Sequence, residues 1–222
     1  MTNFCLQGVL FDLDGTLVDT AADLMACLNR SLQAYGFAAV DEQLLRPQIS
    51  LGALAMIRQA VPTADIELQQ RIQDSMLDFY EQNIAEYSRC YQGMAEVLQT
   101  IEQLGLKWGV VTNKKQRFTQ PLLAALQLSE RAACAISGDS TPYSKPHPEP
   151  LFAACRQAGL NPAQCVYIGD AAHDISAGKQ ANMRTLAAAY GYVGEGCQVE
   201  SWGADGIITH PLQLQNWIQA HL

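Results

Sequence analysis

The chain has 222 residues, of which 49 % are hydrophobic and 16 % are charged, and this composition excludes a mainly disordered chain. Its 14 Lys and Arg residues and 22 Asp and Glu residues give a net charge of −8, which disfavours a general binder of nucleic acid or of anionic membranes. A small anionic substrate remains compatible with this charge, because such a ligand needs only a few local cations or one metal ion.

The N-terminal segment and the cysteines indicate a cytoplasmic protein. Residues 1–8 contain no Lys or Arg, and Asp12 and Asp14 interrupt the apolar run that follows, so the segment lacks the pattern of a secretory signal. No stretch of the sequence reaches the roughly 18 apolar residues that a membrane-spanning helix needs. The seven cysteines are dispersed without a CxxC pair, which is typical of reduced thiols in the cytosol.

Apolar runs of strand length alternate with helical patterns over most of the chain. The first run, GVLFD at residues 8–12, predicts a buried strand that ends in a carboxylate. Similar runs predict strands at 107–111, 134–137, 165–168, 184–188 and 206–208. Apolar residues at helical spacing predict helices at 93–104, 116–126, 149–158, 174–182 and 212–220. This alternation predicts a parallel sheet with helices on both faces.

The segment between Thr20 and about Tyr91 breaks the alternation and contains no convincing strand. Thr20 and Asp23 have the spacing of a capping box, which predicts a helix that runs to about Tyr35. Two further helical patterns follow, at 50–60 and 64–87. An all-helical insert between two strands predicts a separate small domain.

These patterns divide the chain into two predicted domains. Residues 1–18 and 89–222 form a three-layer, Rossmann-like α/β core, and residues 19–88 form an all-helical cap that is inserted after the first strand. The linkers lie near Val18 and Ser88, and we expect them to absorb a motion of the cap.

Polar residues follow four of the predicted strands. They are Asp12, Asp14 and Gly15 after the first strand, Thr112 and Asn113 after the second, Lys145 after the third, and Asp170 and Asp174 after the fourth. Each residue alone has a plainer explanation, as a turn former, a helix cap or a solvated surface charge. Because ligands bind outside the carboxyl ends of parallel strands, the recurrence of such residues at four strand ends favours a shared site.

The residue types in this set suit attack on phosphorus. Clustered carboxylates repel each other and need a cation, which Lys145 or a metal ion can supply, and oxygen ligands suit Mg²⁺. One Asp can attack the phosphoryl group and form an acyl phosphate, while a second protonates the leaving alkoxide and then activates water. Asp12 and Asp14 can divide these tasks, and Gly15 allows the backbone to approach a phosphate closely.

The motifs resemble, in order, those of the haloacid dehalogenase superfamily of phosphohydrolases. They are DLDGTLVD from Asp12, Thr-Asn at 112–113, Lys-Pro-His-Pro from Lys145 and Gly-Asp-x-x-x-Asp from Gly169. The helical insert after the first motif resembles the cap of the phosphoglycolate phosphatase branch. The resemblance implies a Mg²⁺-dependent phosphomonoesterase that acts through an aspartyl-phosphate intermediate on a small phosphorylated metabolite.

The same resemblance implies a role for each site residue. Asp12 would be the nucleophile and Asp14 the general acid/base. The phosphoryl group would be held by Thr112, Asn113, Lys145 and Gly15, with Lys145 also in a catalytic role. The Mg²⁺ ligands would be Asp12, the main-chain carbonyl of Asp14, and Asp170, with Asp174 as an auxiliary acid.

The second half of the chain narrows the resemblance without deciding the substrate. Segments such as Trp108–Lys114, with Tyr190–Tyr192, are similar to a group of bacterial phosphatases in that branch that act on N-acetylmuramate 6-phosphate. Both 2-phosphoglycolate and N-acetylmuramate 6-phosphate therefore stay open as substrates. Ala171 departs from the pattern, because many relatives have Ser or Asp there, and its effect on the metal site is open.

Two other functions use the same fold. A sugar phosphomutase with this cap needs cap His and Lys residues, but the first Lys is Lys107 and the first His is His147, so this alternative is disfavoured. A non-catalytic phosphate-binding module is expected to lack one of the catalytic carboxylates, and none is missing here.

The expected partner is a small phosphate ester, with no nucleic acid and no membrane, and the expected state is a monomer or weak homodimer. Both candidate substrates carry a carboxylate, which an arginine of the cap could bind. Arg46 and Arg58 are the candidates by chain position, and a role as surface partners of nearby acids is the alternative. The Ser50–Ala53 loop is a further candidate for substrate contact.

Overall fold

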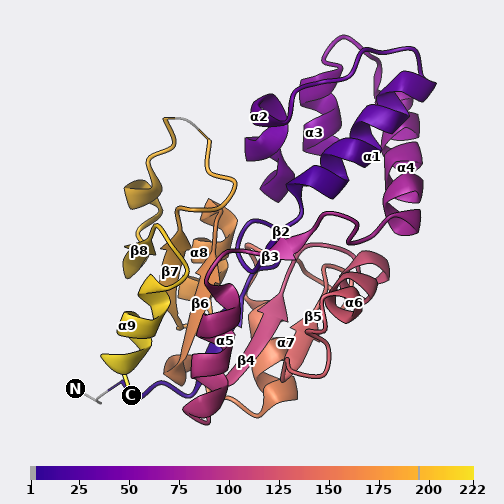
Figure 1. Ribbon diagram of the computed structural model, residues 1–222. Helices are drawn as coiled ribbons and strands as arrows, with labels where there is room; N and C mark the ends of the chain where they lie inside the picture. Colours follow the sequence, from indigo (N-terminus) through magenta and orange to yellow (C-terminus); the bar gives the residue numbers. More distant parts are fainter. Residues whose placement is uncertain (1–3, 195) are drawn as a thin grey trace.

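The computed structural model describes residues 4–194 and 196–222, so residues 1–3 and 195 of the predicted core lie outside the described part. Within that part, six strands form the main sheet in the order β5-β4-β1-β6-β7-β8, and every neighbouring pair is parallel (Figure 1). The strands are β1 (Gly8–Phe11), β4 (Lys107–Val111), β5 (Cys134–Ile136), β6 (Cys165–Gly169), β7 (Arg184–Ala188) and β8 (Gly206–Ile208). The predicted strands are confirmed, with ends that differ by one residue at most.

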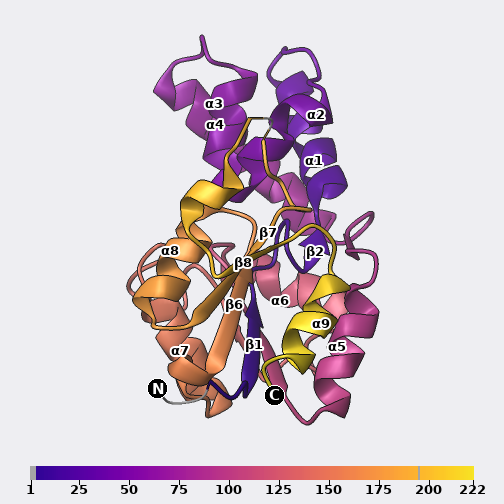
Figure 2. The same cartoon turned by 90° about the vertical axis from the view of Figure 1, so that its left-hand side faces the viewer.

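Strand β1 shows how the sequence buries both faces of the sheet. Val9 and Phe11 pack into one hydrophobic cluster with residues of α5, α6 and α9, while Leu10 packs on the opposite face with residues of α7 and α8. Figure 2 shows the resulting three layers, with α7 and α8 on one side of the strands and α5 and α9 on the other. The core helices are α5 (Met94–Gln103), α6 (Gln116–Ala125), α7 (Glu149–Ala158), α8 (Ala172–Gln180) and α9 (Gln213–Gln219), and the 3₁₀ turns are η2 (Pro162–Gln164) and η3 (Val199–Trp202).

The centre of the sheet determines where a ligand can bind. β1 lies between β4 and β6, with Phe11 opposite Val110 on one side and opposite Ile168 on the other. The residues that follow these three strands therefore meet at one edge, which is the usual ligand site of an open parallel sheet.

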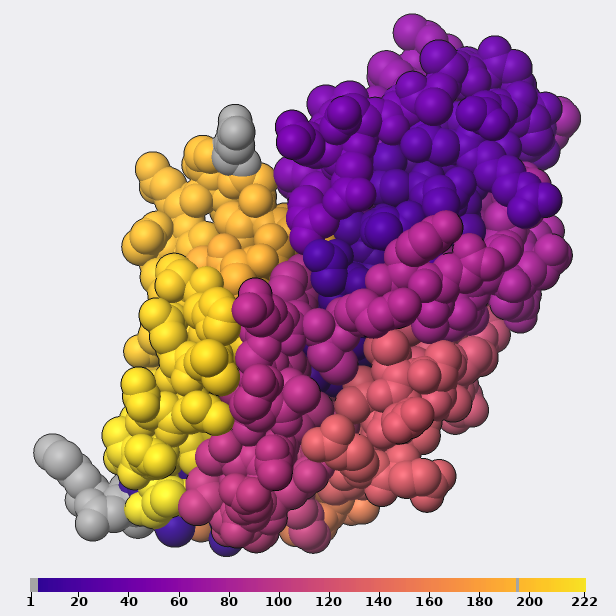
Figure 3. All heavy atoms as spheres, viewed as in Figure 1, coloured from indigo at the N-terminus to yellow at the C-terminus, as the bar shows by residue number. Residues whose placement is uncertain are grey.

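A second body of helices lies above that edge (Figures 1 and 3). Its elements are α1 (Ala21–Ala34), α2 (Glu42–Leu45), the 3₁₀ turn η1 (Arg46–Leu51), α3 (Ala53–Ala60) and α4 (Ile66–Gln82). They surround a hydrophobic cluster of their own, which includes Leu28, Leu32, Ile57, Ile72 and Met76. No helix among the described residues is both long and apolar enough to cross a membrane.

Two helix predictions in this region need correction. The helix predicted at 50–60 begins at Ala53, because Gly52 has a φ of 92° and separates α3 from η1. The helix predicted at 64–87 ends at Gln82, and Ala85 has a φ of 63°, a conformation that no α-helix contains. The short helix α2 was not predicted, because four residues are too few for a helical period to show.

The two linkers contain the strands that the sequence pattern did not predict. β2 (Val18–Asp19) and β3 (Arg89–Cys90) form an antiparallel pair, so the chain enters and leaves the helical body side by side. The predicted capping box is wrong, because the Thr20 side chain makes no cap hydrogen bond. The Asp23 carboxylate instead accepts hydrogen bonds from the main-chain N–H groups of Tyr87 and Ser88 at 2.8 and 2.9 Å, and also from the Ser88 hydroxyl.

Candidate active site

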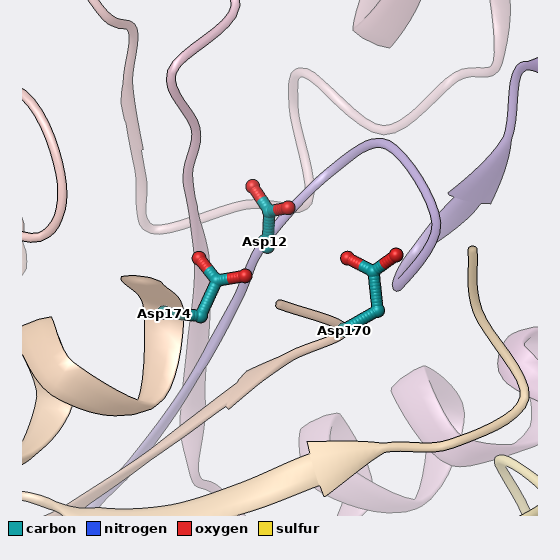
Figure 4. A group of neighbouring side chains, drawn as sticks. All are labelled: Asp12, Asp170 and Asp174. Carbon is teal, nitrogen blue, oxygen red and sulfur yellow. The ribbon is translucent and has the colours of Figure 1, made fainter. Parts of the chain in front are cut away.

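Three buried carboxylates converge where β1 and β6 end (Figure 4). Asp12 follows β1, Asp170 follows β6, and Asp174 lies in the first turn of α8. One oxygen atom of each lies within 4.8 Å of one from each of the others, and the residues are 5 %, 2 % and 0 % exposed. The main-chain N–H of Asp12 donates to the carbonyl of Ile168 at 2.8 Å, which holds Asp12 beside β6.

Lys145 lies against this acid cluster, formed by Asp12, Asp170 and Asp174. Its Nζ is 2.7 Å from an oxygen of Asp12 and 2.7 Å from an oxygen of Asp174, and it is also within 2.9 Å of the Val111 carbonyl and the Tyr167 hydroxyl oxygen. Burial alone would lower the pKa of Lys145, but Asp12 and Asp174 raise it above its usual value, so the ammonium stays charged. Because its three N–H groups already face four acceptors, a phosphoryl oxygen would have to replace one of them.

The net charge of the acid cluster with Lys145 suits one divalent cation. Three carboxylates face the single ammonium of Lys145, so two negative charges are uncompensated when all are ionised. Burial, together with the neighbouring acids, raises the pKa of Asp12 well above its usual value and that of Asp170 to about 7. His173 does not supply the missing charge, because burial lowers its pKa. Oxygen donors with a surplus charge of −2 fit Mg²⁺.

Asp14 occupies a different environment from the acid cluster. Its carboxylate accepts hydrogen bonds from Lys114 Nζ at 2.9 Å and from the Thr20 hydroxyl at 2.6 Å. Burial alone would lower the pKa of Lys114, but Asp14 raises it, so the two groups form an ion pair. The sequence therefore places two acids on one turn, and the fold gives each its own lysine.

Asp170 is held from three directions. The Ser50 hydroxyl donates to its Oδ2 at 2.8 Å, the main-chain N–H of Tyr192 donates to the same oxygen at 2.9 Å, and the Thr16 hydroxyl faces Oδ1 at 3.4 Å. Ser50 belongs to η1, so a hydroxyl of the helical body contacts an acid of the sheet edge.

Gly15 is required by the close approach of these groups. Its φ is 85°, and a Cβ atom there would lie 2.2 Å from Asp170 Oδ2 and 2.8 Å from the ring of Tyr192. Any larger residue would therefore push Asp170 out of the acid cluster. A glycine at this position allows the turn after β1 to lie against the end of β6.

Thr112 and Asn113 lie at the same edge, but their side chains are already bonded. The Thr112 hydroxyl accepts the main-chain N–H of Lys114 at 3.1 Å. The Asn113 side chain pairs with the main chain of Lys145, with its oxygen accepting at 3.0 Å and its nitrogen donating at 3.1 Å. Asn113 thus joins the β4 end to the loop that carries Lys145.

A cavity of about 300 Å³ lies between the sheet edge and the helical body. One side, here called the core wall, is lined by Asp12, Asp14, Thr112, Asn113, Lys114, Lys115, Phe118, Lys145 and His173. The other side, the cap wall, is lined by Leu24, Ile49, Ser50, Leu51, Gly52, Ala53, Met56, Gln73, Leu77 and Tyr80. The predicted Ser50–Ala53 loop therefore does line the cavity.

The arginines of the helical body do not line this cavity in the described part of the chain. Arg46 pairs instead with Asp19 and Glu42, at 2.7 and 2.6 Å, so the surface-partner alternative holds for Arg46. Lys115 lines the cavity, is exposed, and takes part in no ion pair among the described residues. Within the described part of the chain, the lining cation without an ion pair therefore lies on the core wall.

The structure brings together the predicted residues Asp12, Lys145, Asp170 and Asp174, and it places Asp14, Gly15, Thr112 and Asn113 around them. The carboxylate of Asp14 lies outside the acid cluster. Four residues that contact these groups were not predicted as site residues: Thr20, Lys114, Tyr167 and Tyr192. Lys114 could have been found, because it directly follows Thr112 and Asn113 at the end of a predicted strand.

The chain belongs to the haloacid dehalogenase-like hydrolase family, whose model matches residues 9–188. Over 98 % of both chains it is 43 % identical to the N-acetylmuramic acid 6-phosphate phosphatase of Pseudomonas putida. Over 94 % of both chains it is 38 % identical to the phosphoglycolate phosphatase of Xanthomonas campestris.

Solved structures agree with this family. A crystal structure of a predicted phosphoglycolate phosphatase from Haemophilus somnus has a TM-score of 0.85 with this chain, at 27 % identity, and the match covers 96 % of this chain and 97 % of that one. The predicted α/β fold and the prediction that the chain is a phosphatase are therefore confirmed.

Proposed function

We propose that this phosphatase is a Mg²⁺-dependent phosphomonoesterase that transfers the phosphoryl group of its substrate to Asp12. The proposal rests on the different surroundings of Asp12 and Asp14. Asp12 and Asp14 line the same cavity, yet Asp12 belongs to a metal-like acid cluster and Asp14 to a separate lysine and threonine pair. Two carboxylates in different environments can serve as nucleophile and as acid/base.

The first half-reaction uses both acids. A carboxylate oxygen of Asp12 forms a bond to phosphorus as the bond from phosphorus to the ester oxygen breaks. Asp14, which has to take up a proton before this step, passes that proton to the departing oxygen. In the second half-reaction Asp14 removes a proton from water, the water oxygen attacks phosphorus, and the Asp12 carboxylate is released with inorganic phosphate. Lys114 and Thr20 orient Asp14 for both transfers.

Asp12, Asp170 and the main-chain carbonyl of Asp14 would hold the Mg²⁺ ion, with Asp174 as an auxiliary acid. When bound, the ion would neutralise negative charge on the phosphoryl group. Lys145 favours the ionised form of Asp12, against the effect of burial, and would contact the phosphoryl group, as would Gly15, Thr112 and Asn113. Since the side chains of Thr112 and Asn113 already have partners, we assign much of their contact to main-chain N–H groups.

Residues 19–88 serve as a cap and residues 1–18 and 89–222 as the catalytic core. The helical body covers the carboxyl edge of the sheet and supplies one side of the cavity, so its closure would exclude water from the reaction. The paired linkers β2 and β3 give that motion a narrow pivot.

The cap wall supports N-acetylmuramate 6-phosphate as the substrate. Leu24, Ile49, Leu51, Met56 and Leu77 give it an apolar surface, which suits the methyl groups of the acetamido and lactyl substituents. The cavity volume equals roughly ten waters, more than a two-carbon acid needs beside its phosphate. Lys115 can pair with the lactyl carboxylate.

2-Phosphoglycolate is the second candidate, because it also carries a carboxylate for Lys115. A comparison of kcat/KM for the two esters decides between them, and a hundredfold preference corresponds to about 2.7 kcal/mol of transition-state binding. Faster turnover of N-acetylmuramate 6-phosphate supports our substrate assignment, and faster turnover of 2-phosphoglycolate contradicts it. Loss of hydrolysis of both esters would contradict the phosphatase mechanism itself.

The covalent step has a separate test. Wild-type protein that is mixed with an ester labelled in its phosphoryl group and then quenched in acid should carry the label, because an acyl phosphate on Asp12 survives brief acid treatment. Asp12→Asn protein should carry none. Equal labelling of the two proteins would contradict the assignment of Asp12.

A further inference from the structure

A network of side chains outside the catalytic cavity joins the cap to the surroundings of Asp14 and of Asp170. Arg46 lies at the start of η1, Asp19 lies in β2, and Tyr192 lies on the loop that rises from β7 towards the cap (Figures 1 and 2). Arg46 donates to Asp19 Oδ2 at 2.7 Å, and its guanidinium lies 4.9 Å from the centre of the Tyr192 ring. The Tyr192 hydroxyl donates to Asp19 Oδ1 at 2.9 Å. We call these three residues the clasp.

The clasp reaches Asp14 through one residue. The Tyr192 hydroxyl accepts the main-chain N–H of Thr20 at 2.6 Å, and the Thr20 hydroxyl donates to Asp14 Oδ1 at 2.6 Å. Thr20 and Tyr192 are 0 % and 3 % exposed, so solvent does not compete for the hydrogen bond that joins them. The position of the Asp14 carboxylate therefore depends on a hydroxyl that the clasp holds.

The clasp also lies next to Asp170, by two routes. The main-chain N–H of Tyr192 donates to Asp170, and Ser50, which is four residues beyond Arg46 in η1, donates to the same oxygen. Pro47 of η1 lies close to Gly194 of the loop, where an added Cβ atom would be 3.2 Å from the proline ring. The η1 turn and the loop therefore meet along several residues.

The strength of the clasp suits a contact that has to open and close. The side chains of Arg46 and Asp19 are 32 % and 37 % exposed, so solvent screens the attraction between them. Such a pair adds little to the free energy of unfolding. The contacts of Arg46 instead fix positions, because they hold a cap residue, a linker residue and a core loop against one another.

We propose that Arg46, Asp19 and Tyr192 are positioning residues, which connect the seated position of the cap to the placement of the Asp14 carboxylate. This inference rests on the proposed role of Asp14 as the acid that protonates the departing oxygen. With the clasp formed, Thr20 points its hydroxyl at Asp14. Without the clasp, Asp14 loses one of its two hydrogen-bond donors.

The test compares two kinds of leaving group. An alkyl ester, such as N-acetylmuramate 6-phosphate or 2-phosphoglycolate, needs a proton on its departing oxygen, whereas p-nitrophenyl phosphate releases a stable phenolate that needs little protonation. Values of kcat/KM report the steps through phosphoryl transfer to Asp12. A misplaced acid therefore lowers kcat/KM for the alkyl ester selectively, and a merely structural defect lowers both values alike.

For Tyr192→Phe, which removes only the hydroxyl, we expect kcat/KM for the alkyl ester to fall about tenfold or more, and that for p-nitrophenyl phosphate to fall less than about threefold. Arg46→Gln should show the same selectivity with a smaller loss, and Arg46→Lys should recover part of it. Because Arg46 is partly exposed, its variants keep the test valid if Tyr192→Phe folds poorly. Arg58→Gln, a change at another cap arginine, is the matched control and should leave both values unchanged.

Mg²⁺ binding, followed by thermal shift, gives a readout that does not depend on activity. Tyr192→Phe keeps the main-chain N–H that contacts Asp170, so its Mg²⁺ midpoint should stay within about twofold of wild type. Equal losses on the two esters, no loss on either, or a large shift in the Mg²⁺ midpoint would each overturn the inference. If Asp14→Asn itself shows no selectivity for the alkyl ester, the proposed function fails. If Asp14→Asn is selective and Tyr192→Phe is not, only the clasp fails.

Discussion

The core wall and the cap wall of the cavity differ in chemistry, although both belong to one short chain. Among the residues that the structure describes, both acids and all three lysines that line the cavity belong to the core wall, and each of them follows a strand of the sheet. The cap wall contains mainly apolar side chains, with Ser50, Gln73 and Tyr80 as its polar members. This difference supports the proposal that the sheet edge holds the reacting groups, while the inserted helices contact the rest of the substrate.

The largest effect is expected for a substitution at Asp12, on the core wall. Asp12→Asn should lower kcat by about 10⁴-fold or more on every ester, because the amide cannot attack phosphorus. Circular dichroism should show an unchanged fold, since Asn keeps the size of the side chain. Appreciable turnover by this variant, on any ester, would reject the covalent route.

Removal of the metal ion should abolish hydrolysis without unfolding the protein. Excess EDTA is expected to abolish hydrolysis of all esters, and Mg²⁺ at a hundred times its Kd should raise the free energy of unfolding by about 2.7 kcal/mol. Calorimetry on protein with and without Mg²⁺ measures the second effect, and Asp170→Asn should weaken it. Undiminished hydrolysis in EDTA would contradict the metal assignment.

Lys115 lies on the core wall, but in our proposal it would contact the leaving group. Lys115→Met should lower kcat/KM by about tenfold for esters that carry a carboxylate and leave p-nitrophenyl phosphate unchanged. Arg117→Met, a change at a neighbouring cation that does not line the cavity, is the control. The same loss on both kinds of ester would remove Lys115 from carboxylate recognition.

The smallest effect is expected on the cap wall. Leu51 lines the cavity and is 62 % exposed, so Leu51→Ala should lower kcat/KM for N-acetylmuramate 6-phosphate by about fivefold and change the value for 2-phosphoglycolate little. Leu44→Ala, at an exposed cap residue outside the cavity, serves as the matched variant. A larger effect on the smaller ester would reverse our assignment of the apolar surface.

The sheet and its edge could be predicted because each strand is a continuous apolar run with polar residues directly after it. The contacts of the linkers and of the clasp could not be predicted in this way. The Thr20 hydroxyl and the Asp23 carboxylate fit a local capping pattern, but their partners are Asp14 and residues 87–88. Tyr192 contacts Thr20 across 172 residues of chain, and no local period indicates such a contact. Tertiary partners thus replaced the expected local ones.

The pairing of β2 with β3 has a consequence for how this architecture can diversify. Because the chain leaves the sheet and returns to it at adjacent points, with Asp23 bonded to the returning strand's approach, a different insert could replace the helices without moving a single strand of the core. Evolution could therefore exchange the helical insert as a unit and leave the residues at the sheet edge unchanged.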